Sequence, residues 1–192
     1  MSGSRGLSQA ISEGDGISIL VEVRDPDGAR LAAADGADGL VLRGLVDGVR
    51  EVAALPLLVY GPSPRDAAEA AADAVVLGAD EEPEHLVQLL DQAGALGLEC
   101  VVRVRDDDDL ERVLDHLDPE ILLLSAEEAG EDESPIDRLL SLLHDVPAGK
   151  LAVAELVGAT RADVDELERA GVDAVLVSGT AAHLVADEPP DV

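Results

Sequence analysis

Four polar side chains in this sequence occupy equivalent places, each at the end of a short apolar run. The runs end as Leu20-Val-Glu22, Leu58-Val-Tyr60, Val101-Val-Arg103 and Val153-Ala-Glu155. If these runs lie side by side, the two carboxylates and the phenol could exchange protons with a bound molecule, and the guanidinium could hold its anionic groups. The alternative is a buried ion cluster without a ligand, in which Arg103 balances Glu22 and Glu155.

A second group of candidates follows the last apolar run, in the turn Ser178-Gly179-Thr180. A small turn of this kind at the start of a short helix presents backbone N–H groups, which favour phosphate and other anions. The alternative is a simple helix cap made by the hydroxyl of Ser178 or Thr180.

Alternating strands and helices must position these candidates. Eight short runs are almost continuously apolar, which is typical of parallel strands covered on both faces. They span 17–24, 39–43, 55–60, 73–78, 99–105, 120–125, 150–156 and 173–178. Between them the pattern predicts amphipathic helices at 84–97, 107–117, 135–144 and 161–170, and helix starts at Ser63-Pro64, Ser134-Pro135 and Thr160.

This alternation predicts the α/β class, as a compact (β/α)₈ TIM barrel. An open, doubly wound sheet is the alternative if 39–43 is not a strand. In a barrel, inward side chains of alternate strands form layers, and chemistry lies at the carboxyl ends of the strands. We therefore expect the four polar side chains to meet in that mouth. Gly158, after the seventh strand, would face the Ser178–Thr180 turn in a phosphate grip.

The predicted domain organisation is a single barrel over 17–184. An N-terminal segment, 1–16, precedes it, and an acidic tail with two prolines, 185–192, follows. With 47% apolar residues the chain has enough material for a folded core.

The charge balance restricts the partners. The chain has 42 Asp and Glu against 13 Lys and Arg, a formal net charge of −29. Such a surface repels nucleic acid and anionic membranes, so neither is expected as a partner. The acidity indicates either a hydrated acidic shell, as in a halophilic cytoplasm, or the composition of a GC-rich genome.

Rare residue types exclude several kinds of site. Tyr60 is the only aromatic residue, which excludes aromatic cofactor sandwiches. Cys100 is the only cysteine, and the four histidines lack ligand spacing, so no metal and no cofactor is expected. The acidic run 106–109 is better explained as a helix cap than as a cation site. Without a membrane-length apolar run or a secretory signal, we expect a cytoplasmic protein.

Four stretches, Leu96–Leu114, Lys150–Glu155, Thr160–Val164 and Ala170–Val177, carry a resemblance to a known family. From about residue 17 to 184 the sequence resembles indole-3-glycerol-phosphate synthase. The resemblance implies a barrel that binds a phosphorylated substrate. It also implies the family reaction, a decarboxylative ring closure by a carbon–carbon lyase of tryptophan biosynthesis.

The resemblance also implies roles for single residues. The family's Glu-x-Lys in the first strand appears as Glu22-Val-Arg24, so Arg24 would hold a substrate carboxylate or phosphate. The glutamate of the seventh strand is Glu155, and the asparagine of the sixth strand falls at Ser125. Ser178-Gly-Thr180 takes the place of the family's Gly-x-Ser.

Other positions depart from the family pattern. Its strand-3 lysine, a proposed general acid, is Tyr60 here, and its strand-5 glutamate is Arg103. Arginine holds its proton too firmly to donate it, and tyrosine has an ordinary pKa near ~10. Two functions therefore stay open: a diverged lyase or isomerase acting on a sugar phosphate, and a non-catalytic paralogue that binds a metabolite or a partner protein. The sequence leaves the oligomeric state open.

The net charge leads to a first prediction. Self-repulsion at −29 should destabilise the folded state at low ionic strength, and salt should screen it. We expect a higher thermal midpoint in molar potassium chloride than in dilute buffer. Equal midpoints would contradict the halophilic interpretation and leave genome composition as the explanation.

Overall fold

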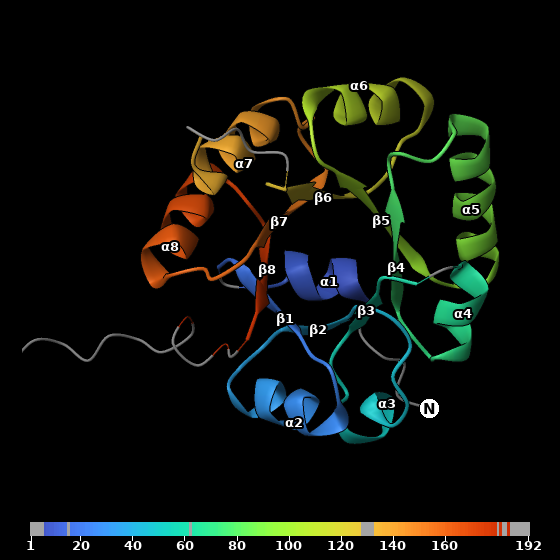
Figure 1. Cartoon of the computed structure of the whole chain (residues 1–192), viewed down its shortest axis with the longest axis vertical. Coiled ribbons are helices and arrows are strands. Elements are labelled where there is room, and N and C mark those ends of the chain that lie inside the picture. The colour runs from blue at the N-terminus through green and yellow to red at the C-terminus, as the bar shows by residue number, and fades with distance from the viewer. Residues whose placement is uncertain are drawn as a thin grey trace, which may run out of the picture.

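Eight parallel strands close into a barrel in chain order, with β8 pairing back onto β1 (Figure 1). The computed structural model describes residues 6–14, 16–61, 63–127, 133–179, 181 and 184. This closed sheet confirms the predicted (β/α)₈ barrel and excludes the open doubly wound sheet. The strands are β1 (Ser18–Glu22), β2 (Gly39–Leu42), β3 (Leu57–Val59), β4 (Ala74–Gly78), β5 (Glu99–Val104), β6 (Ile121–Ser125), β7 (Leu151–Leu156) and β8 (Ala174–Ser178).

Helices surround the barrel, one after each of the first seven strands (Figure 1). They are α2 (Pro26–Ala34), α3 (Val49–Val52), α4 (Pro64–Glu69), α5 (Pro83–Ala95), α6 (Asp107–His116), α7 (Pro135–His144) and α8 (Arg161–Ala170). The expected starts are confirmed: Ser63 and Ser134 cap helices that begin with proline, and Thr160 forms a capping box with Asp163. Some of these helices are very short, as α3 is, and this allows a (β/α)₈ barrel to be formed within 192 residues.

The core has two parts because each strand is covered on both faces. Side chains that point outward from the barrel pack beneath the helices. Side chains that point inward fill the barrel, and they include Leu20, Leu58, Val101 and Val153 from the odd-numbered strands. The even-numbered strands contribute Val41, Val76, Leu123 and Leu176 to the same interior. The interior is therefore packed with aliphatic side chains in alternating layers.

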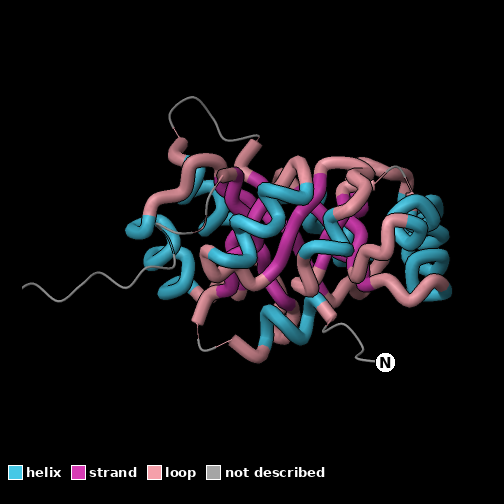
Figure 2. The backbone as a smooth tube through the Cα atoms, turned by 90° about the horizontal axis from the view of Figure 1, so that it is seen from below, coloured by secondary structure: helices cyan, strands magenta, loops and turns pink. Residues whose placement is uncertain are grey.

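An additional helix, α1 (Leu7–Ser12), closes the amino end of the barrel. Leu7 and Ile11 belong to the interior core, and the backbone N–H of Ser8 donates to Glu99 Oε2 at 3.0 Å. Figure 1 shows α1 across the centre of the ring, and Figure 2 shows it beneath the strands. The interior is thus covered at this end by α1, and its other end carries the candidate site.

No helix in the described ranges is long and apolar enough to cross a membrane.

Candidate functional site at the barrel mouth

The structure brings together the four polar side chains that end the odd-numbered strands. Since side chains two residues apart on a strand share a face, Glu22, Tyr60, Arg103 and Glu155 continue the interior layer of Leu20, Leu58, Val101 and Val153. At the carboxyl ends of the strands, Tyr60 and Arg103 both bind Glu155, and Glu22 is linked to Glu155 through Arg43.

Glu155 is the centre of this group. Its Oε1 accepts hydrogen bonds from the Tyr60 hydroxyl, at 3.1 Å, and from Arg43 Nη2, and its Oε2 accepts from Arg103 Nε at 3.0 Å. The side chain is only 7% exposed. Burial alone would raise the pKa of Glu155, but the hydrogen bond from Arg43 and the charge of Arg103 outweigh it and hold the pKa below its ordinary value. Glu155 is therefore a buried, ionised carboxylate.

Arg43 is a member of the mouth that the sequence analysis missed. It follows β2, two residues after the inward-pointing Val41, and so takes the same place in the even-numbered layer. Its Nε donates to Glu22 Oε2 at 3.1 Å, and its guanidinium carbon lies 4.1 Å from the centre of the Tyr60 ring. Aligning the even-numbered strands by their apolar runs, as was done for the odd ones, would have found it.

Ser125 and Ser178, which end the even-numbered strands β6 and β8, form hydrogen bonds with side chains of the odd-numbered strands. Arg103 Nη2 donates to Ser125 Oγ at 2.8 Å, and Ser178 Oγ donates to Glu22 Oε2 at 3.2 Å. Arg103 also pairs with Glu127, which lies on the rim and is 63% exposed. The group formed by Glu22, Arg43, Tyr60, Arg103 and Glu155 is called the mouth cluster below.

Tyr60 carries a neutral hydroxyl within the mouth cluster. Burial and the negative charge of Glu155 raise the pKa of Tyr60, and they outweigh the opposite effects of Arg43 and Arg103. The phenol is therefore a hydrogen-bond donor to Glu155 and holds its proton at neutral pH.

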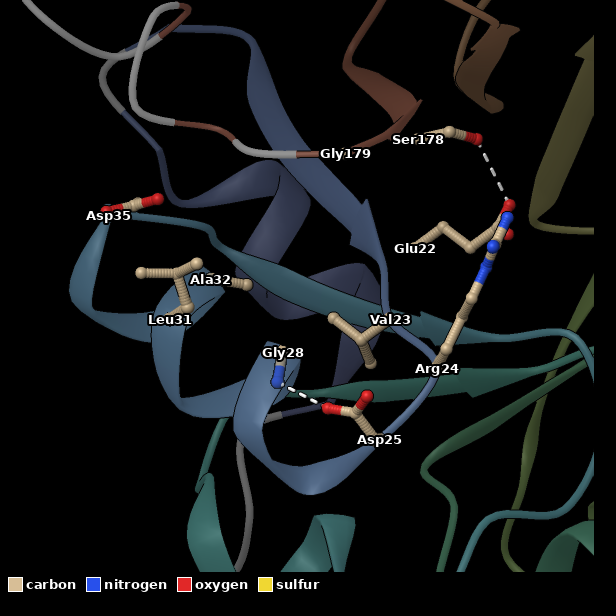
Figure 3. A pocket seen from close by; sticks show the side chains of 10 residues that line it. All are labelled: Glu22, Val23, Arg24, Asp25, Gly28, Leu31, Ala32, Asp35, Ser178 and Gly179. Carbon is tan, nitrogen blue, oxygen red and sulfur yellow. Dashed lines mark hydrogen bonds between the residues drawn. The ribbon is translucent and has the colours of Figure 1, made fainter.

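An open cavity of about 500 Å³ adjoins the mouth cluster. Figure 3 shows it between the end of β1, helix α2 along its length to Asp35, and the turn after β8, with Ser178 directed at Glu22. Arg24 is exposed and lines this cavity, together with Gly179, whose φ of +109° favours glycine. Gly158, with φ +70°, follows β7 but does not line the cavity. Thr180 lies outside the described residues.

The acidic run after β5 has structural partners. Asp106 caps α6 through the backbone N–H of Asp109 at 2.7 Å, and the buried Asp109 carboxylate pairs with Arg105 and Arg112. Across the ranges that the structure describes, no group of three or more His, Cys, Asp and Glu side chains could hold a metal ion.

The ionisation of Tyr60 can be followed directly because the chain has no other tyrosine and no tryptophan. We expect the tyrosinate absorbance of the folded protein to develop well above the ordinary pKa of 10.0, and that of the urea-unfolded chain to develop near it. Since the folded state then binds the proton more tightly, the free energy of unfolding falls as the pH rises above that value.

Circular dichroism in the same titration establishes that the chain is still folded. A folded-state midpoint at or below that of the unfolded chain would contradict the burial of Tyr60 beside an ionised Glu155.

Comparisons with known proteins place this barrel in a family. A family model described as indole-3-glycerol phosphate synthase matches residues 65–187. The indole-3-glycerol phosphate synthase of Geobacillus sp. (strain WCH70) is 28% identical over 141 residues, 70% of this chain and 55% of that protein. That of Burkholderia vietnamiensis (strain G4 / LMG 22486) is 35% identical over 119 residues, 62% of this chain and 44% of that protein. The chain spans about half the length of these curated relatives.

Solved structures agree on the fold. The N-acetylmannosamine-6-phosphate 2-epimerase of Clostridium perfringens superposes with a TM-score of 0.69 at 14% identity, covering 86% of this chain and 87% of the other. The thiamine phosphate pyrophosphorylase of Pyrococcus furiosus gives 0.65 at 16%, covering 89% of each chain. At such identities the similarity shows the fold alone. The family model, in contrast, matches more than half of the sequence, and the chain belongs to the indole-3-glycerol phosphate synthase family.

Proposed function

We propose that the barrel mouth binds a phosphorylated small molecule, with its phosphate at the turn after β8 and its body against the mouth cluster. The observation that carries this proposal is the hydrogen bond from Ser178 to Glu22, because it joins the turn and the cluster across one cavity. Arg24 would add positive charge to the same cavity, and Gly158 and Thr180 would complete the phosphate grip.

The family supports a phosphate ester as the ligand class. The curated relatives are named for indole-3-glycerol phosphate, and the matched segment, 65–187, includes the β8 turn. The surrounding protein carries a net charge of −29, so an anionic ligand needs local positive charge and oriented N–H groups. Two features support such a site: Arg24 lines the cavity beside Gly179, and Arg43 pairs with Glu22, which accepts from Ser178.

Substitution of Gly179 tests the phosphate site. We expect glycerol 3-phosphate at millimolar concentration to raise the thermal midpoint, and Gly179→Ala to weaken this effect at least about tenfold in ligand concentration. An alanine at φ +109° strains the turn that would present the N–H groups, although its Cβ would meet no atom within 4 Å.

Gly149→Ala is the matched control. Gly149 has φ +93°, its added Cβ would likewise meet nothing within 4 Å, and it precedes β7 at the opposite end of the barrel. It should lower stability by a similar amount and leave the ligand effect unchanged. If glycerol 3-phosphate and inorganic phosphate both leave the midpoint of the parent unchanged, the turn is only a cap and the proposal is wrong.

A second candidate function, ligand binding without turnover, is favoured by the state of the mouth cluster. The family reaction needs a proton donor where Tyr60 replaces lysine, and the raised pKa of Tyr60 leaves that hydroxyl protonated and weakly acidic. Arg43 and Arg103 hold their protons permanently. Glu155 could still stabilise a developing positive charge or accept a proton, provided that a ligand displaces one of its partners.

A double substitution distinguishes the two candidates. Tyr60→Lys with Arg103→Glu restores the family's layer of Glu, Lys, Glu and Glu. We expect no indole-3-glycerol phosphate formation in the parent and detectable formation in the double variant, as a decayed synthase requires. Formation already in the parent would overturn the non-catalytic candidate. Each single substitution serves as a control, since it restores only half of the layer.

A further inference from the structure

We infer that Arg43 is a specificity-determining residue, which binds a second oxyanion on a phosphorylated ligand through the free edge of its guanidinium. The inference rests on the proposed phosphate site and adds the class of molecule that the site selects. That class is a short phosphate ester with another negatively charged oxygen group, such as a carboxylate, a few bonds from the phosphorus.

The hydrogen bonds of Arg43 leave donors available. A guanidinium has five N–H groups. In Arg43, Nε donates to Glu22 and Nη2 donates to Glu155, whereas the Nη1 donors have no partner among the residues that the structure describes. The side chain is 39% exposed, compared with 16% for Arg103. A molecule entering the mouth would therefore meet Arg43 before the deeper members of the cluster.

The neighbours of Arg43 hold its guanidinium in one orientation. Glu22 binds its Nε and Glu155 its Nη2, and its guanidinium carbon lies 4.1 Å from the centre of the Tyr60 ring. A guanidinium group that is held in this way loses little rotamer freedom when it binds a carboxylate. Because the ligand would take the Nη1 donors, Glu22 and Glu155 keep the hydrogen bonds that Arg43 donates to them.

The size of the ligand follows from a shared contact. Glu22 Oε2 accepts from Ser178 Oγ at 3.2 Å and from Arg43 Nε at 3.1 Å. The turn proposed for the phosphate and the guanidinium proposed for the second oxyanion thus lie on two sides of one carboxylate oxygen. A three-carbon backbone is long enough to reach from one to the other.

Two phosphate esters that differ at one carbon form the test. In 3-phosphoglycerate a carboxylate stands where glycerol 3-phosphate has a hydroxymethyl group. We expect the protein to bind 3-phosphoglycerate at least about tenfold more tightly, as measured by calorimetry, since a charge-assisted bond to arginine is worth about this much. Arg43→Gln should abolish the preference, because it should weaken the binding of 3-phosphoglycerate at least about tenfold more than that of glycerol 3-phosphate.

Arg169→Gln is the matched control. It removes the same charge from the exposed last turn of α8, at the amino end of the barrel, and should keep the preference. If Arg169→Gln reduces the preference as much as Arg43→Gln does, general electrostatics explains it and the inference is wrong. Loss of affinity for both esters in equal proportion in Arg43→Gln would also overturn it, because Arg43 would then only support the cluster.

A spectroscopic measurement on the parent protein keeps the test valid if Arg43→Gln does not fold. Tyr60 is the only aromatic residue and lies against Arg43, so an anion bound to the guanidinium should alter the electric field at the ring and change its near-ultraviolet absorption. We expect a difference spectrum with 3-phosphoglycerate that is much smaller with glycerol 3-phosphate. Binding of both esters with identical spectra and affinities overturns the role of Arg43 alone, whereas binding of neither contradicts the phosphate site itself.

Discussion

The buried carboxylate of Glu155 is the constraint on which the mouth depends. An ionised group at this depth is destabilising unless charged donors surround it, and removal of one partner of such a pair typically costs about 3–5 kcal/mol. Its three donors come from the ends of β2, β3 and β5, so they meet only in a closed barrel. The pairing of this one carboxylate therefore depends on the closed arrangement of the strands.

Below this polar layer the interior core is aliphatic. Its buried members are leucine, valine, isoleucine and alanine, with no phenylalanine or tryptophan to fill space. Such side chains pack a narrow barrel in repeating layers, but they have no polar atoms with which to fix ligand orientation. Specific recognition is therefore left to the last inward position of each strand, which is where Glu22, Ser125 and Ser178 lie.

The fold could be predicted largely from the sequence because each strand is a continuous apolar run. All eight strands were found, including 39–43, the one on which the open-sheet alternative depended. Helix α1 was not found. It has only six residues, and its N-cap, Gly6, makes no side-chain hydrogen bond, so no local signal distinguishes it from a loop. Its stability comes from burying Leu7 and Ile11 in the barrel, which is a tertiary effect.

The site could be predicted less completely. Period-two spacing placed Glu22, Tyr60, Arg103 and Glu155 at one level, and the structure joins them. The same spacing would have placed Arg43 there, but only the odd-numbered strands were aligned in this way, and Arg43 follows an even-numbered one. The segment matched by the family model begins at residue 65, after Glu22, Arg43 and Tyr60. Three of the five members of the mouth cluster thus lie outside the matched segment, where spacing along the strands, and not the family model, identifies them.

The attachment of α1 has a consequence for the order in which the chain folds. Its anchor, Glu99, lies 91 residues from Ser8 and opens β5. The bond between Ser8 and Glu99 therefore cannot form until the fifth strand has been made, whereas the contact of Ala10 with Ser18 of β1 spans only eight residues. Contacts of such long sequence separation form late because the intervening loop must be closed first. The helix that covers the amino end of the barrel can thus contact β1 early, but its anchor to β5 forms late.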